Sequence, residues 1–214
     1  MMKEALSTLV IHDIKNSLAL LEADLEQLNH HPDMPEEARK AYQRCSELKG
    51  RLVSFLTLYK HEQFGLRPNL AEVDLREFLQ DTLDVSPSAS GKHGHAFEME
   101  VDEARIRIAP GMKRGGTALL DEYLTGVAIE SALNNAVRYA AGNVRVWFEQ
   151  DADKVTFFVQ DDGPGLHHPS GNAPSTGVGL ALCKAVVEAH GGGDVSLTDA
   201  PGGGALFRLA LHTA

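Results

Sequence analysis

The sequence predicts a two-part fold: an antiparallel helical hairpin that forms a dimeric four-helix bundle, followed by an α/β sandwich. Apolar residues in the first part recur at alternating steps of three and four, the period of a helix packed against partner helices. From about residue 68 the pattern changes to short strand-like runs interspersed with helical ones. A chain of 214 residues is long enough for one good core and a smaller second element. We therefore expect two domains, residues 1–64 and 65–214.

Two long helices make up the predicted hairpin. The first covers residues 3–29, and its apolar seam is Ile11, Ile14, Leu18, Leu21, Leu25 and Leu28. Residues 31–35 contain two prolines, which end one helix and begin the next. The second seam is Ala41, Cys45, Leu48, Leu52, Phe55 and Tyr59. Such a hairpin buries one stripe of each helix, and pairing two copies closes a core, so a homodimer is expected. Packing as a helical cap within one chain is the alternative.

The remainder of the chain predicts helices stacked on one face of a mixed sheet. The expected strands are residues 96–101, 106–109, 144–149, 155–160 and 206–211. The expected helices are residues 75–83, 118–140 and 180–189. Residues 86–94 are small and polar with glycine and proline, which indicates a loop.

Composition excludes several classes of function. The 20 basic residues are outnumbered by 30 acidic ones, the formal net charge is −10, and no basic cluster occurs, so binding to nucleic acid is not expected. No apolar run approaches the roughly 18 residues of a membrane span, so we expect a cytoplasmic chain without a membrane segment. Cys45 and Cys183 lack the spacing of a zinc site or a disulfide framework and are interpreted as packing residues.

The run His12-Asp13-Ile14-Lys15-Asn16 places a histidine beside the apolar seam of the first helix, facing outward. Asn16 lies one turn on, within about 40° of His12 around the helix. The carboxylate of Asp13 can accept a proton from one imidazole nitrogen and make the other more nucleophilic, and the carboxamide of Asn16 can position water. These three are candidate catalytic residues for phosphoryl transfer. An ordinary exposed helix face is the competing interpretation of this run.

Two glycine-bearing motifs indicate a nucleotide site. Residues 161–165, Asp-Asp-Gly-Pro-Gly, follow a predicted strand. Residues 175–180, Ser-Thr-Gly-Val-Gly-Leu, lead into a predicted helix whose first amides are free to bind phosphate. A carboxylate such as Asp161 can accept a hydrogen bond from an adenine amino group, and glycines let the backbone approach base and phosphates closely. Either motif alone also fits an ordinary turn.

Asn135, Arg138 and Tyr139 share one face of the helix before these motifs, at spacings of three and four. An amide oxygen suits Mg²⁺, which prefers oxygen ligands and keeps phosphates and waters in its shell, and Arg138 can neutralise phosphate charge. We therefore expect a nucleotide with Mg²⁺ to bind here. The candidate nucleotide-binding residues are Asn135, Arg138, Tyr139, Asp161, Gly163, Gly165, Thr176, Gly177, Gly179 and Leu180, with Asn135 also the candidate metal ligand.

In order and spacing, these motifs resemble the catalytic core of two-component sensor histidine kinases. The chain is similar to that family in an H-box at residues 12–16, an N-box around Asn135, a G1 box at residues 161–165 and a G2 box at residues 176–179. The resemblance extends to Asp121 and Glu122, at the start of the N-box helix, and to residues 189–192. It covers nearly the whole chain.

The resemblance implies a dimerisation and histidine-phosphotransfer hairpin joined to a Bergerat-type ATP-binding domain. It implies that His12 accepts the phosphoryl group, that Asp13 acts as the base and that Asn16 assists a phosphatase reaction. The phosphoryl group then passes to an aspartate of a response-regulator receiver domain.

For the ATP-binding domain, the resemblance implies that Asn135 binds Mg²⁺, Arg138 contacts phosphate and Asp161 binds adenine. The glycines implied to shape the pocket are Gly163, Gly165, Gly177 and Gly179.

The chain departs from the family pattern in several places. Ser131 stands where the N-box often has a further Asn, Ser175 replaces a frequent first glycine of the G2 box, and Ser17 replaces the usual H-box proline. Only eleven residues, 166–176, span from the G1 box into the G2 box, with no phenylalanine motif. Because an ATP lid excludes water, a short one predicts weaker nucleotide binding or poorly positioned γ-phosphate transfer.

Three functions remain open at this point. The leading hypothesis is an ATP-dependent protein-histidine kinase that phosphorylates His12. The main alternative is a histidine phosphotransferase or phosphatase of the same fold with little or no use of ATP. A third is a dimeric adaptor in which nucleotide only selects a conformation.

Overall fold

The structure is a computed structural model that describes residues 17, 20, 21, 23, 36–84, 98–110, 115–166 and 177–213, without the side chains of residues 36–40, 42 and 43. By compactness the chain divides into two units, Met1–Leu56 and Thr57–Ala214. Helix α2 (Glu36–Phe64) runs through this division. It ends at Gly65, which has a φ of 70° and donates its N–H to the carbonyl of His61 (2.8 Å). The predicted domain boundary after residue 64 thus falls at the end of a helix, and as a boundary it stays a prediction.

The described part of the first unit is helical. Ser17, Leu20, Leu21 and Ala23 lie in helix, as does α2. Cys45 is buried, whereas Leu48 and Phe55, which also belong to the predicted second seam, are exposed. The break at residues 31–35 and most of the predicted first helix lie outside the described residues. The paired, four-helix arrangement of two chains stays a prediction.

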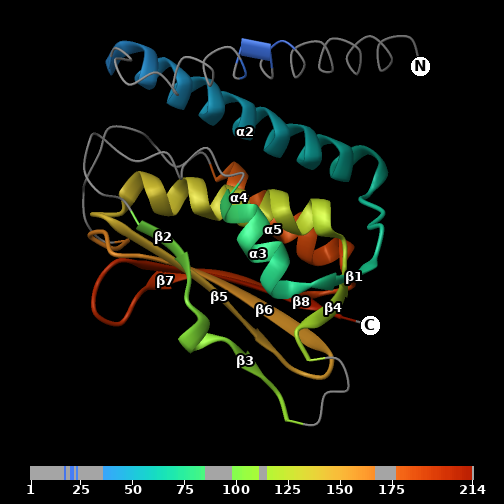
Figure 1. Ribbon diagram of the computed structural model, residues 1–214. Helices are drawn as coiled ribbons and strands as arrows, with labels where there is room; N and C mark the ends of the chain where they lie inside the picture. Colours follow the sequence, from blue (N-terminus) through green and yellow to red (C-terminus); the bar gives the residue numbers. More distant parts are fainter. Residues whose placement is uncertain are drawn as a thin grey trace. The chain divides into compact units, whose positions relative to one another are not determined.

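The second unit is an α/β sandwich whose helices cover one face of a mixed sheet (Figure 1). The sheet has the order β2-β5-β6-β8-β7, and β3 pairs with the far end of β5. β2 and β3 run parallel to β5, and the other pairs are antiparallel. The strands are β2 (Glu98–Val101), β3 (Arg107–Ile108), β5 (Asn143–Gln150), β6 (Lys154–Asp161), β7 (Gly193–Asp199) and β8 (Ala205–His212). The helices are α3 (Leu75–Asp84), α4 (Glu122–Tyr139) and α5 (Val178–Ala189).

Successive side chains of the central strands point to opposite faces of the sheet. Phe148 and Phe157 are cross-strand partners on β5 and β6, and both are fully buried. Phe157 packs edge-on against Phe78 of α3, with ring centroids 5.7 Å apart, so this face is the one beneath the helices. Their neighbours Trp147 and Phe158 stack on the opposite face at 4.9 Å.

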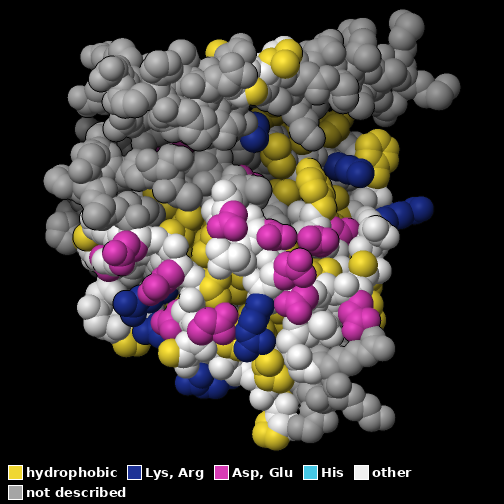
Figure 2. Space-filling view, in the orientation of Figure 1, with side chains coloured by type: hydrophobic (Ala, Val, Ile, Leu, Met, Phe, Trp, Pro, Cys, Tyr) yellow, Lys and Arg dark blue, Asp and Glu magenta, His cyan; other side chains and the backbone are white. Residues whose placement is uncertain are grey.

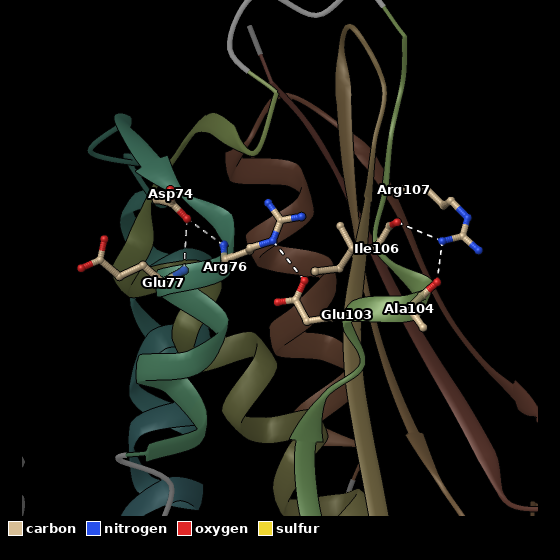
Figure 3. Close-up of polar contacts among 7 residues, drawn as sticks. All are labelled: Asp74, Arg76, Glu77, Glu103, Ala104, Ile106 and Arg107. Atoms are coloured by element: carbon tan, nitrogen blue, oxygen red, sulfur yellow. Dashed lines mark hydrogen bonds and ion pairs between the residues drawn. The ribbon is translucent and has the colours of Figure 1, made fainter.

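A short hydrogen-bond chain fixes the start of α3 beside the sheet (Figure 3). Asp74 caps the helix, because its Oδ1 accepts from the backbone N–H groups of Arg76 (2.9 Å) and Glu77 (3.1 Å). The Nε of Arg76 then reaches Oε2 of Glu103 (3.2 Å), in the 3-10 helix η2 (Glu103–Arg105). Arg107, also drawn in Figure 3, instead donates to two backbone carbonyls of its own turn.

The predicted strands and helices of this unit are present, but one of the helices begins later than predicted. The helix predicted over residues 118–140 begins too early, because Thr117–Leu120 form strand β4, which pairs with β1 (Ala71–Asp74). The buried Gln150 holds this turn: its Oε1 accepts from Gly116 N (2.7 Å), and its Nε2 donates to Thr117 O (2.6 Å). Strands β1, β4 and β7 were not predicted, and the loop expected at residues 86–94 lies outside the described residues.

The surface agrees with the acidic composition. Acidic side chains spread across the middle of the face seen in Figure 2, with basic side chains between them. Within the described ranges, the longest apolar helical stretch falls short of what crossing a membrane requires. Cys183 is buried in α5, and burial raises the pKa of its thiol to about 12, so it behaves as a packing residue as expected.

His190, at the end of α5, ties that helix to the start of α4. Its buried ring accepts a hydrogen bond from Asp121 N at Nε2 (3.0 Å), while Nδ1 contacts the carbonyl of Val186 (2.8 Å). An N–H facing Nε2 and a carbonyl facing Nδ1 require the neutral tautomer that carries its proton on Nδ1.

We expect His190→Leu to lower the free energy of unfolding by about 1–3 kcal/mol, because it leaves the buried N–H of Asp121 without an acceptor. Urea unfolding followed by circular dichroism measures the change. His212 is exposed, so His212→Leu is the matched control and should shift stability by less than about 0.5 kcal/mol. Equal effects of the two substitutions would contradict the tie between α4 and α5.

Candidate functional site

The candidate site lies at the carboxyl end of β6. Its last residue, Asp161, is buried, and its Oδ1 accepts hydrogen bonds from Gly163 N (2.8 Å) and Ala205 N (3.2 Å). Burial raises the pKa of Asp161, with a further contribution from the charge of Asp162, and the two N–H donors offset this only in part. Its Oδ2 has no hydrogen-bond partner among the described residues and is the atom available to a ligand.

The pKa of Asp162, the next residue, is shifted in the opposite direction. Its Oδ1 accepts from the backbone N–H groups of Ala141 (2.8 Å), Gly142 (3.0 Å) and Asn143 (3.0 Å). Its Oδ2 accepts from Nδ2 of Asn143 (2.7 Å). Partial burial acts to raise its pKa, but these hydrogen bonds, that from the Asn143 side chain first, outweigh burial and lower the pKa to about 2.

Gly163 allows the G1 run to pass against the end of α4. A Cβ at this position would collide with the carbonyl oxygen of Tyr139 and would lie 2.8 Å from Oδ1 of Asp161. The requirement is for space, since the φ of Gly163 is not among the positive values. The structure therefore brings the backbone of Tyr139 together with Asp161 and Gly163, and their roles in nucleotide binding stay predictions.

Of the other predicted residues of α4, Arg138 directly precedes Tyr139 and Asn135 lies one turn earlier. Asn135 is exposed, and the guanidinium carbon of Arg138 lies 5.6 Å from the centre of the Tyr139 ring. The helix begins at Glu122, with Asp121 as the N-cap that accepts from Leu124 N (2.8 Å).

The second glycine motif reaches the same helix from α5. A Cβ on Gly179 would lie 2.7 Å from Oγ of Ser131 and 3.7 Å from Nδ2 of Asn135, so the backbone of α5 runs close alongside α4 here. Gly177 begins α5 with a φ of 69° and no side-chain cap. The first amides of α5, next to exposed Leu180, thus lack a capping side chain and carry the positive end of the helix dipole.

Gly165 and the chain after it contact the end of β7. Gly165 has a φ of 79°, and a Cβ there would lie 2.6 Å from Oδ1 of Asp199. The same oxygen accepts from Leu166 N (2.7 Å). His12, Asp13, Asn16 and Thr176 lie outside the described residues, so their predicted roles stay predictions.

One contributor, the turn between β7 and β8, was not predicted from the sequence. A Cβ on Gly204 would collide with the backbone carbonyl of Asp161, and Ala205 donates to the carboxylate of the same residue. The run Gly202-Gly203-Gly204, with positive φ throughout, was the available signal. Asp162 was also missed as a structural residue, although it lies inside the G1 run.

A cavity of about 300 Å³ lies elsewhere, on the face of the sheet away from the helices. Arg105 lines it, with its guanidinium 4.6 Å from the Trp147 ring centre, Nε 3.2 Å from Asp102 and Nη1 2.6 Å from Oε1 of Gln160. The charge of Arg105 is thus satisfied within the protein. None of the candidate nucleotide-binding residues lines this cavity, and Asp161, Gly163 and the end of α4 meet instead at the end of β6.

The fold and this convergence of residues define the class of protein. Residues 121–214 match the family described as histidine kinase-, DNA gyrase B-, and HSP90-like ATPase. The match covers less than half of the chain and lies within the second unit. The matched segment contains the N-box helix, both glycine motifs and the missed glycine turn.

Similar proteins are named as sensors of two-component type, which supports the resemblance to the sensor histidine kinase core, while its dimerisation hairpin stays a prediction. The chain is 25% identical over 239 residues to sensor protein KdpD of Escherichia coli, an alignment covering 98% of this chain and 24% of that protein. It is 28% identical over 217 residues to two-component sensor PhoQ of Pseudomonas aeruginosa, covering 94% and 45%. The chain thus spans less than half the length of these relatives.

Solved structures of histidine kinases share the fold. Full-length ShkA in complex with AMPPNP superposes with a TM-score of 0.64 at 23% identity, covering 99% of this chain and 46% of ShkA. Histidine kinase AdeS of Acinetobacter baumannii gives 0.56 at 18% identity, covering 94% and 97%. Histidine kinase ThkA in complex with response regulator protein TrrA gives 0.56 at 15% identity, covering 98% and 61%.

The described residues fit a magnesium nucleotide better than a metal held by protein alone. No group of three or more His, Cys, Asp or Glu side chains among them is arranged to hold a metal ion. A single amide, that of Asn135, suits an ion whose other ligands are phosphates and waters. Uncapped amides at α5 and a half-satisfied carboxylate at Asp161 supply complementary partners for phosphate and for an amino group.

The close contact at Gly163 leads to a stability prediction. We expect Gly163→Ala to lower the free energy of unfolding by about 1–3 kcal/mol, because the methyl group has no room beside Tyr139. Gly126, inside α4, is the matched control, since a Cβ there lies 3.8 Å from Phe78, and Gly126→Ala should stabilise by about 0.5–1 kcal/mol. Thermal unfolding of both variants checks the pair, and a stabilising Gly163→Ala would refute the contact.

The lowered pKa of Asp162 gives a pH dependence with a definite sign. A carboxyl group whose pKa is lower in the folded state stabilises the fold fully above its unfolded value of 3.8, and this contribution is lost as pH falls toward about 2. Asp162→Asn should therefore be less stable than the parent at pH 7, with a gap that narrows below about pH 4. Urea midpoints at pH 7, 4 and 3 test this. A gap that is constant across the series would show that the charge of Asp162 does not matter.

Proposed function

We propose that this chain is the core of an ATP-dependent protein-histidine kinase of a two-component system. It autophosphorylates His12 with Mg·ATP and passes the phosphoryl group to an aspartate of a response regulator. The observation that carries the proposal is that one helix, α4, touches both glycine motifs, at Tyr139 with Gly163 and at Ser131 with Gly179. Such a helix presents Asn135 and Arg138 between an adenine-binding carboxylate and a phosphate-binding helix terminus.

In this proposal Asp161 binds the adenine amino group through Oδ2, the oxygen left without a described partner. Phosphates lie toward the first amides of α5, from Gly177 to Leu180, where the helix dipole favours negative charge. Arg138 supplies a cation, and Asn135 supplies an amide oxygen for Mg²⁺. When bound, the metal neutralises phosphate charge during transfer.

At His12, an imidazole nitrogen attacks the γ-phosphorus of ATP. The nitrogen–phosphorus bond forms as the bond to the bridging oxygen breaks, and ADP leaves with its electron pair. Asp13 accepts the proton from the other ring nitrogen. A receiver carboxylate then takes the phosphoryl group from His12, and Asn16 assists hydrolysis by positioning water.

The proposed assembly is a cytoplasmic homodimer that pairs through the hairpins. Leu48 and Phe55, on the predicted seam of α2, are exposed in the single chain, as expected of residues that a second copy covers. A receiver domain is the proposed partner of His12. The solved complex of ThkA with response regulator TrrA, whose kinase has this fold, supports that choice.

A second function is a histidine phosphotransferase or phosphatase that makes little or no use of ATP. The short connection over residues 166–176 favours it, because few residues are available to cover the phosphates. In this case His12 exchanges phosphoryl groups with receiver domains and the nucleotide pocket is vestigial.

Radiolabelling separates these functions. With Mg·ATP labelled at the γ-phosphate, the parent should acquire acid-labile, alkali-stable phosphate, and His12→Gln should acquire none. The exposed His212 provides the control His212→Gln, which should label as the parent does. Asp161→Asn should label less at low ATP, since its Nδ2 cannot accept from an adenine amino group. A His12→Gln variant that labels as strongly as the parent would refute the mechanism.

Calorimetry with a non-hydrolysable ATP analogue identifies the alternatives. The absence of saturable Mg²⁺-dependent binding, combined with labelling of His12 from a phosphorylated receiver, would establish the phosphotransferase. Saturable binding without labelling of His12 from either source would leave only an adaptor whose conformation nucleotide selects.

A further inference from the structure

Asp162 connects the two halves of the candidate nucleotide site. Its side-chain oxygens accept hydrogen bonds from the three residues that join α4 to β5, namely Ala141, Gly142 and Asn143. In the reverse direction, Asp162 N donates to Asn143 O (3.2 Å). These hydrogen bonds attach the G1 run to residues 141–143, which follow the N-box helix.

The geometry around Oδ1 is that of an anion-binding nest. Three consecutive backbone N–H groups converge on this one oxygen, at 2.8, 3.0 and 3.0 Å. Hydrogen bonds to an ionised acceptor are stronger than neutral ones, so the nest prefers a carboxylate to an amide. Water is a poor substitute, because it brings no charge and must itself be held in place.

The residues on either side of this nest are those assigned to nucleotide. Asp161 precedes Asp162, and Gly163 follows it against the carbonyl of Tyr139, the last residue of α4. Asn135 and Arg138 lie within the last turns of the same helix. Loss of the nest would let the end of α4 move relative to the Oδ2 of Asp161.

From this geometry we infer that Asp162 is a positioning residue for nucleotide binding, which acts as a carboxylate by holding the end of α4 in register with Asp161. The inference rests on the proposed function, because the ligand is ATP. Asp162 contacts none of the reacting atoms, so its loss weakens nucleotide binding and leaves phosphoryl transfer at saturation unchanged.

The test measures the dissociation constant of a fluorescent ATP analogue with Mg²⁺ for a graded series of full-length variants. Asp162→Asn keeps an acceptor for the backbone N–H groups but loses the charge, and we expect binding about three- to tenfold weaker. Asp162→Ala removes every acceptor and should weaken binding more than tenfold. Asn143→Ala removes only the 2.7 Å side-chain bond and should have the smallest effect, so it serves if the Asp162 variants fail to fold.

Asp194→Asn is the matched control. Asp194 is also exposed and hydrogen-bonded, to Nη1 of Arg208 at 2.8 Å. Strand register places it at the opposite end of the sheet, since β7 pairs Asp194 with Ala210, which pairs with Thr156 of β6. This substitution removes the same charge and should leave nucleotide affinity unchanged.

A second measurement separates positioning from simple loss of stability. His12 labelling at saturating Mg·ATP should reach the parent level in Asp162→Asn, while the half-saturating ATP concentration rises. Parent-like affinity in Asp162→Asn and Asn143→Ala, whatever their melting temperatures, would overturn the inference and leave the kinase proposal standing. A parent that shows no saturable binding would overturn the ATP proposal and the role of Asp162 with it.

Discussion

Two adjacent carboxylates at the end of β6 hold three separate segments of the second unit together. Asp161 accepts N–H groups from its own turn and from Ala205, which follows the glycine turn between β7 and β8. Asp162 accepts those of the segment between α4 and β5. Backbone N–H groups in loops lack partners from helix or sheet, so each must find another acceptor. Asp161 and Asp162 provide such acceptors for segments that are far apart in the chain. The candidate site forms where these segments meet.

The two carboxylates differ in how far the protein satisfies them. The hydrogen bonds of Asp162 to Ala141, Gly142 and Asn143 lie within the protein, and they lower its pKa to about 2. Asp161 is more deeply buried and has fewer donors, and its pKa is raised. A buried carboxylate with an unused oxygen gains free energy when a ligand donates to it. The same local sequence thus provides one residue for structure and one for binding, and the difference follows from depth of burial together with the number of internal donors.

Structure set by local interactions could be predicted from the sequence, whereas structure set by contacts between distant segments could not. Strands such as that expected over residues 155–160 depend on local alternation of side chains, and this one was predicted closely, since β6 is Lys154–Asp161. Residues 118–120 have a helical pattern locally but form β4, because pairing with β1 and the Gln150 amide outweigh it. Motif order identified Asp161 and Gly163. It did not identify Asp162 as a structural residue, because its partners come from another loop that only the fold brings near.

The departure from the family pattern at Ser131 has a physical explanation in the packing of α4 on α5. The hydroxyl of Ser131 occupies the space where a Cβ on Gly179 would lie, 2.7 Å away. A short side chain on one helix and none on the other allow the backbones to come close, and Asn135 lies beside the same glycine. A longer amide at position 131 would have to turn away from α5 or move it. Ser131 therefore preserves the close approach that brings Asn135 beside the amides of α5, and the missing Asn does not by itself argue against a nucleotide at this site.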